Sequence, residues 1–223
     1  MMSKKTIFII IWLILLSLGP ITVIRNTPEL SINFFQRMFG LWAFTLLFIQ
    51  IILGAFMQKL TEKLGGWVFK FHITEGLFAY ALVFSHPLLF AVLNYQTSGV
   101  FNPFYVYLGF SLKDIELFYS FGRSAFWLMT LAVVAALLRT QPWLQNNWRK
   151  FHILNYFVFF AVWYHSFKVG TDIGTFPFSF FHGPAFVIVL GIVLYRLFSY
   201  FKSLFTSPSR SGSTSPNTST RRE

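Results

Sequence analysis

The sequence predicts an all-α protein, a polytopic bundle of six transmembrane helices. Of its 223 residues, 55% are hydrophobic and only 11% are charged, whereas a soluble domain carries about 25% charged residues. Several apolar runs approach the roughly 20 residues that cross a bilayer as one helix. Short polar stretches separate these runs. We therefore expect a single membrane domain over residues 1–205, surrounded by membrane lipid.

The predicted helices follow the apolar runs in order. Lys4 and Lys5 precede the first run, and no A-x-A-like cleavage site follows it, which favours an uncleaved helix over a secretory signal. Each later run is bounded by charged or turn-forming residues. The six segments fall at about 6–24, 38–57, 67–93, 120–138, 151–169 and 183–201.

Two stretches lie outside these segments. The longest connection, about 94–119, is rich in aromatic residues, and its Asn102-Pro103 pair predicts a turn. From residue 206 onward Ser, Thr and Pro dominate, and such a composition cannot bury enough apolar surface to order itself. Residues 206–223 are therefore predicted to form a disordered cytoplasmic tail.

The distribution of positive charge predicts the orientation. With a cytoplasmic N-terminus, thirteen of the 18 lysines and arginines face the cytoplasm, and membrane proteins carry their Lys/Arg excess on that side. The prediction is a multi-pass protein of the cell (inner or plasma) membrane with both termini cytoplasmic. The net charge of +11 then reflects topology, and no nucleic acid is expected as a partner. The five outer cations are Arg25, Arg37, Lys113, Arg123 and Lys168.

Histidine is the chain's only strong soft-metal ligand. Cysteine is absent, which excludes disulfides, iron–sulfur clusters and covalent heme attachment through CxxCH. Four of the five histidines occur in pairs: His72 and His86 on the third segment, His152 and His165 on the fifth, 14 and 13 residues apart. Each pair spans about 20 Å of helix, so each segment offers one ligand near either membrane face.

The third and fifth segments run in the same direction. His72 is therefore expected level with His152 near the cytoplasm, and His86 level with His165 near the outside. Facing imidazoles are suitable axial ligands for heme iron, which predicts two b-type hemes between these helices. On an ideal helix a 14-residue step returns within about 40° of the same face, but a 13-residue step lands about 140° away. The fifth helix is thus expected to depart from ideal geometry, and Pro87 predicts a disturbance in the third.

Other interpretations of these residues stay open. A single histidine on an apolar face is usually a hydrogen-bonded packing residue, although four intramembrane histidines in level pairs favour function. His182 is expected at the outer interface. Glu75 follows His72 by three positions, and such a pair occurs in di-iron bundles. Because Glu75 is the only acid in the six segments, a hydrogen bond to a polar neighbour is favoured, with proton handling as the alternative.

Heme propionates are anions that require partners near the membrane surfaces. Five Lys and Arg residues lie at suitable positions, although the topology of the chain alone would also account for charged residues at these helix ends. Gly40, Gly54 and Gly76 are expected to permit close approach of helices or of a macrocycle. The candidate propionate contacts are Arg37, Arg123, Lys70, Arg149 and Lys150.

Residues from about 33 to 201 resemble the ferric-reductase-like transmembrane domain family, which includes ferric reductases, NADPH oxidases and the heme subunit of methionine sulfoxide reductase systems. The most specific motifs are WRKFHILNY around His152 and YHSFKVGTD around His165, and RMFGLWAF at the second segment is also similar. The resemblance implies six helices, two b hemes held by the four paired histidines, and electrons passing from the inner heme to the outer one.

The chain also departs from that family. No nucleotide-binding motif is visible, so FAD or FMN is expected only through a partner. The resemblance implies a cytoplasmic flavoprotein reductase or a quinol as donor, and an external acceptor, with ferric iron first by analogy. NADPH oxidases carry a further histidine where this chain has Phe90, although their accompanying arginine is matched by Arg37, so superoxide production is not expected.

The expected role is therefore a component of an oxidoreductase, without catalytic residues of its own, that conducts electrons from a separate donor. Two alternatives remain open. The first is a heme-containing subunit that passes electrons to a partner reductase of the methionine sulfoxide reductase type. The second is a non-enzymatic helical bundle that transports metal through its histidines.

Overall fold

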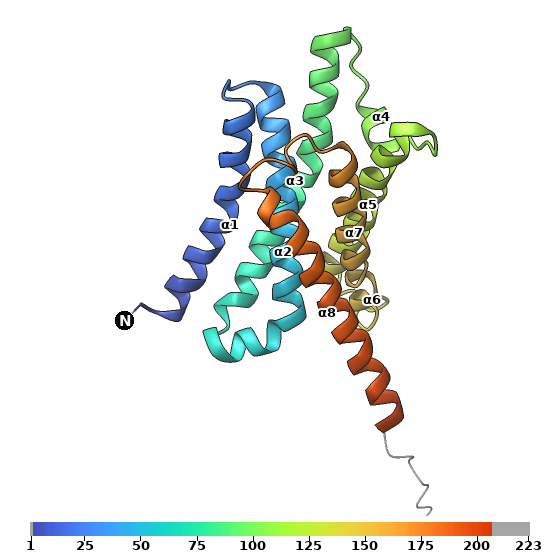
Figure 1. Cartoon of the computed structure of the whole chain (residues 1–223). Helices are drawn as coiled ribbons and strands as arrows, with labels where there is room; N and C mark the ends of the chain where they lie inside the picture. Colours follow the sequence, from blue (N-terminus) through green and yellow to red (C-terminus); the bar gives the residue numbers. More distant parts are fainter. Residues whose placement is uncertain (1, 207–223) are drawn as a thin grey trace, which may run out of the picture.

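A computed structural model of the chain describes residues 2–206, and every regular element within that range is a helix. The predicted all-helical class is confirmed (Figure 1). Five helices are long and apolar enough to cross a membrane, which identifies an integral membrane protein. They are α1 (Lys4–Asn26), α2 (Ile32–Leu64), α3 (Trp67–Ser98), α5 (Asp114–Leu137) and α8 (Ser179–Thr206). The predicted tail beyond Thr206 lies outside the described residues.

The fifth predicted segment is divided. It forms α6 (Trp148–His152) and α7 (Leu154–Val169), separated by a turn at Ile153. Hydrogen bonds of the i→i+3 type surround the break: the Lys150 N–H donates to the Asn147 carbonyl, and the Tyr156 N–H donates to the Ile153 carbonyl. Such tight turns rotate the chain by about 120° per residue instead of about 100°. The departure from ideal geometry therefore lies immediately after His152.

Local chemistry places the helix ends beyond the predicted segments. Ser31 caps α2, because its hydroxyl accepts from the Phe34 N–H at 3.2 Å. Between α2 and α3, Gly65 adopts a φ of 98°, a conformation that only glycine takes readily. The expected turn at Asn102-Pro103 is wrong: Asn102 caps a short helix, α4 (Pro103–Leu108), with proline at its first position. α3 continues through Pro87 without a break.

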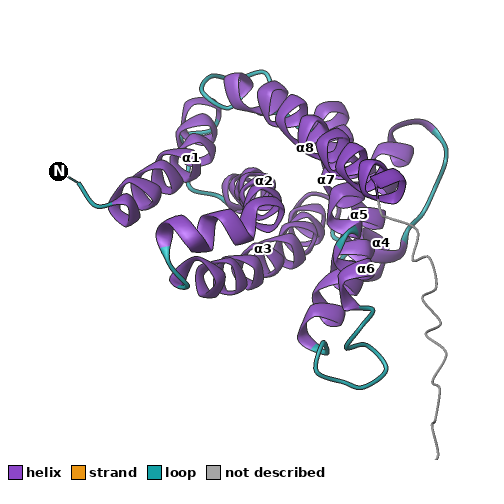
Figure 2. Cartoon of the chain, turned by 90° about the horizontal axis from the view of Figure 1, so that it is seen from below, coloured by secondary structure: helices purple, strands orange, loops and turns teal. Residues whose placement is uncertain are grey.

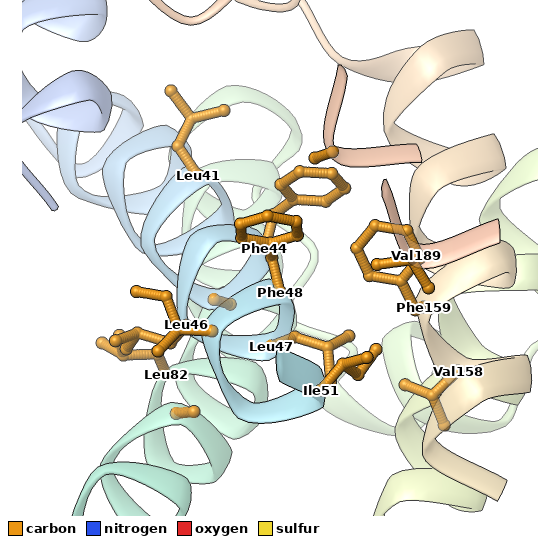
Figure 3. Packing of buried hydrophobic residues seen from close by; sticks show 14 of the residues in the cluster. Leu41, Phe44, Leu46, Leu47, Phe48, Ile51, Leu82, Val158, Phe159 and Val189 are labelled. Atoms are coloured by element: carbon orange, nitrogen blue, oxygen red, sulfur yellow. The ribbon is translucent and has the colours of Figure 1, made fainter. Parts of the chain in front are cut away.

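α2 is the central helix of the bundle. In its most apolar stretch 56% of the residues are buried, against 17% in each of α1, α3 and α8. Figure 2 shows α2 enclosed by α1, α3, α7 and α8. Leu46 of α2 lies toward Leu82 of α3, whereas Phe44 and its neighbours lie toward Phe159 of α7 (Figure 3). The helices at the periphery, α1, α3 and α8, expose apolar side chains, as contact with lipid requires.

The two ends of the bundle differ. One end of the bundle, which we call the inner end, holds both ends of the described chain, together with the turn between α2 and α3 (Figure 1). The opposite end, which we call the outer end, holds the connections between α1 and α2, α3 and α5, and α7 and α8. A kink at Phe56, where φ is −116° and ψ is 17°, bends the last turns of α2 at the inner end.

Candidate functional site

A cavity of about 340 Å³ lies among α2, α3, α5 and α7, toward the outer end of the bundle. His86 of α3 and His165 of α7 both line it. Its remaining wall is mostly apolar and includes Phe44, Phe90 and Val158. The outer histidines therefore come from two different helices and meet at one space.

The His86 ring rests against α2 in a defined orientation. Its Nδ1 donates to the Gln36 carbonyl at 2.8 Å. Gly40, one turn further along α2, leaves room for the ring, because a β-carbon there would stand 2.8 Å from the imidazole Cε1. The side-chain amide of Gln36 also lies 3.5 Å from both ring nitrogens.

His165 repeats this arrangement on α5. Its Nδ1 donates to the Phe118 carbonyl at 2.9 Å. A β-carbon on Gly122, again four residues after the accepting carbonyl, would stand 3.0 Å from that Nδ1. The helix pairs α2–α3 and α5–α7 thus present equivalent histidines to the cavity.

These two bonds define the chemistry of both rings. An imidazole that donates its Nδ1 proton keeps a lone pair on Nε2, the form that binds a metal. Metal-binding histidines commonly donate their other ring N–H to a backbone carbonyl, which fixes the ring and increases its basicity. In each outer histidine, Nε2 is therefore the nitrogen that could bind a metal.

The inner pair is in direct ring contact. The centroids of His72 on α3 and His152 on α6 lie 6.1 Å apart, with the ring planes at 78°. Metal–nitrogen bonds of about 2.0–2.1 Å place two axial imidazoles at a centroid separation of roughly 6 Å, so the observed spacing suits a shared iron. The Nδ1 atoms of both rings are buried without a hydrogen-bond partner. The inner rings therefore lack the backbone anchors of the outer pair.

The inner site also has a glycine on α2, but a looser one. Fourteen residues separate Gly40 from Gly54, as they separate His72 from His86. A β-carbon on Gly54 would stand 3.9 Å from the His72 Cε1, an ordinary van der Waals distance. A β-carbon on Gly76 would instead stand 3.2 Å from the side-chain oxygen of Gln50.

Glu75 does not share a site with His72. Its carboxylate accepts a hydrogen bond from Gln50 of α2 and lies near the Trp12 indole of α1, whereas the His72 ring contacts His152. Within residues 2–206 no group of three or more His, Asp or Glu side chains is arranged to hold a metal ion. A heme differs in this respect, because it needs only axial ligands from the protein.

His182 is a buried packing residue near the start of α8, and its expected position at the membrane interface stays a prediction. It is only 4% exposed, because its ring stacks on Trp163 and packs against Phe44. Its Nε2 lies 2.9 Å from the Ser166 hydroxyl. The ring thus packs against Phe44 and Ser166, which line the cavity, and does not line it itself.

The five candidate propionate contacts separate into two groups. Arg37 and Arg123 line the outer cavity. Lys70, Arg149 and Lys150 are exposed at the inner end. Arg37 is bound by Asp172 and Thr27.

Arg123 uses its Nη1 for both of its hydrogen bonds, to the Gly109 carbonyl and to Glu116. Its guanidinium also lies over the Tyr105 ring, 4.6 Å from the centroid. The guanidinium is therefore held at the cavity while Nε and Nη2 make no bond within the described chain.

Sequence reasoning missed several residues of this site. The carbonyl of Phe118 carries no sequence signal, and Asp172 lies between predicted helices. Gly122 did have a signal: F-G-x-x-A-F occurs at 39–44 and again at 121–126, at the two glycines that accommodate the outer histidines. Comparison of the chain with protein-family models, curated proteins and solved structures finds no match.

Proposed function

We propose that this protein binds two b-type hemes and conducts electrons across the membrane, from a cytoplasmic donor to an extracytoplasmic acceptor. The observation that carries the proposal is the equivalent anchoring of His86 and His165: each donates its Nδ1 proton to a carbonyl four residues before a glycine, and both line one cavity. Packing alone does not require two such anchors at one space. The ring spacing of His72 and His152 supports a second site.

In this proposal the chain's residues position the hemes and exclude water. His86 and His165 would ligate the outer heme iron, and His72 and His152 the inner one. Each heme supplies a one-electron carrier when bound. The mostly apolar wall of the outer cavity would limit water around a heme bound there, while the Gln36 and Phe118 carbonyls hold the two imidazoles in fixed orientations.

The path of the electrons follows from topology. With α6 and α7 as a sixth crossing, the chain has an even number of spans, and the described ends lie at the same end of the bundle (Figure 1). We propose that this end is cytoplasmic and that the membrane is the cell membrane, since most Lys and Arg residues lie there. The resemblance to ferric-reductase-like domains supports a flavoprotein or quinol donor and ferric iron as the acceptor.

The proposal is tested by the absorption spectrum of the purified, dithionite-reduced protein together with heme quantitation. Two hemes per chain are expected. A colourless protein after heme supplementation would overturn the proposal.

Ligand variants separate the two sites. His86→Ala and His165→Ala are each expected to remove the same one heme, and His72→Ala and His152→Ala the other. His182→Ala provides a histidine control outside both pairs. Two hemes retained in all four ligand variants would show that the pairs do not ligate iron.

A further inference from the structure

Glu75 is a buried carboxylate in the inner half of the bundle. Its side chain belongs to a residue only 4% exposed, and its Oε1 has no hydrogen-bond partner. The Trp12 Nε1 is buried and likewise lacks a partner in hydrogen-bonding geometry. An ionised carboxylate in such surroundings is costly unless it is paired. The protonation state of this carboxyl group is therefore sensitive to any change of charge nearby.

Gln50 connects this carboxylate to the inner histidine pair. Its side-chain N–H₂ donates to the Glu75 carboxylate and, at 3.0 Å, to the His72 carbonyl. Glu75 is therefore separated from the His72–His152 site by only one amide and a short stretch of α3. Because the protein interior screens charges weakly, a change of charge at that site would act electrostatically on the Glu75 carboxyl group.

No cation neutralises Glu75, since neither ion pair within residues 2–206 involves it. Gln50 and Trp12, its neighbours on α2 and α1, are uncharged. Arg25 and Arg37 belong to the outer end, His72 and His86 to the heme sites, and Tyr80 bonds to Thr130 of α5. The remaining charged groups of α1, α2 and α3 are exposed at the inner end: Lys4, Lys5, Lys59, Glu62, Lys63 and Lys70.

We propose that Glu75 binds and releases one proton as an electron enters and leaves the inner heme. This inference rests on the proposed function. If His72 and His152 hold a heme, its reduction by one electron would add one negative charge near Glu75, and the Glu75 carboxylate would take up one proton from cytoplasmic water to become a carboxylic acid. Loss of that electron would release the proton again. The local charge is then the same before and after electron arrival.

The test is a redox titration of the inner heme as a function of pH, in full-length protein carrying His86→Ala so that only this heme is observed. Its midpoint potential is expected to fall by up to about 59 mV per pH unit over part of the range, the value for one proton per electron. Glu75→Gln keeps the shape but cannot ionise, so its midpoint should not follow pH there. Glu62→Gln, at an exposed glutamate of α2, should behave as the parent.

Infrared difference spectra between the oxidised and reduced protein supply a second measurement. A protonated-carboxyl band should gain intensity on reduction and be absent in Glu75→Gln. A heme-loaded parent whose midpoint ignores pH, or a Glu75→Gln protein with the parental slope, would overturn the inference while leaving the electron-transfer proposal intact. Failure of the parent to bind heme would instead overturn the proposed function.

Discussion

Gly40 lies directly beneath the imidazole of His86, so close that a β-carbon at this position would stand 2.8 Å from the ring's Cε1. Gly122 has the same relationship to His165 on the other side of the cavity. In both cases the glycine lies one helical turn after the carbonyl that accepts the Nδ1 proton. Because neither glycine has a side chain, each imidazole can reach the carbonyl that accepts its Nδ1 proton.

This relationship predicts the effect of adding one methyl group. Gly40→Ala should push the His86 ring away from α2 and lengthen its bond to the Gln36 carbonyl. Loss of such an orienting bond commonly lowers metal affinity by about 10- to 100-fold, and we expect a drop of that size at the outer heme. Titration of heme into the apoprotein, followed by absorption, measures it. Gly191→Ala is the matched control, because no neighbouring atom lies within 4 Å of its β-carbon position. Equal heme affinity in both variants would contradict the prediction.

His182 provides a prediction of the opposite kind. His182→Phe should keep the stacking on Trp163 and lose only the bond to Ser166. Both hemes should be retained, and unfolding in detergent should show a loss of about 1 kcal/mol, the usual net value of one hydrogen bond. Disappearance of the outer heme signal would mean that His182 acts in the site, not behind it.

The membrane class and the helical fold could be predicted because apolar run length and charge depend little on tertiary detail. The 13-residue spacing of His152 and His165 also indicated that their helix is not ideal. The position of the break at Ile153 was not predictable, because WRKFHIL contains neither proline nor glycine.

The hydrogen-bond acceptors of the outer histidines could not be predicted for a different reason. Backbone carbonyls such as those of Gln36 and Phe118 are present in every residue, so only the packing of one helix on another selects the acceptor. Asp172 was missed because it belongs to a connection, although it is only 3% exposed. The repeated F-G-x-x-A-F was the one visible indication of the two glycines.

Arg37 and Asp172 form an ion pair that joins α2 to the connection after α7, and their side chains are 14% and 4% exposed. Asn26 also donates to Asp172 at 2.8 Å. Asp172→Ala leaves the partly buried Arg37 charge without its acidic partner, so we expect the apoprotein to lose about 3 kcal/mol of unfolding free energy in detergent, the lower end of the range for a broken buried pair. Glu29→Ala, at an exposed acid of the same end, should change it by less than about 0.5 kcal/mol. Comparable losses in the two variants would argue against a stabilising pair.

Arg123 is the outer cation best placed to accept an anionic heme substituent. Arg37 and Arg123 each form an ion pair, with Asp172 and Glu116 respectively. Arg37 uses all three of its side-chain nitrogens in hydrogen bonds, whereas Arg123, which lines the same cavity, uses only Nη1. Arg123→Gln should therefore weaken outer-heme binding by roughly 10-fold, because a hydrogen bond to a charged group contributes about 1.5–3 kcal/mol. Inner-heme binding should be unchanged.

Lys150→Gln removes an exposed cation at the opposite end and serves as the control for Arg123→Gln. Because Arg123 also holds the connection before α5 through the Gly109 carbonyl, Glu116→Gln is needed as a second control that weakens this support without removing the guanidinium. Loss of outer heme in Arg123→Gln but not in Glu116→Gln would assign the effect to the cation. Equal loss in both would assign it to the connection.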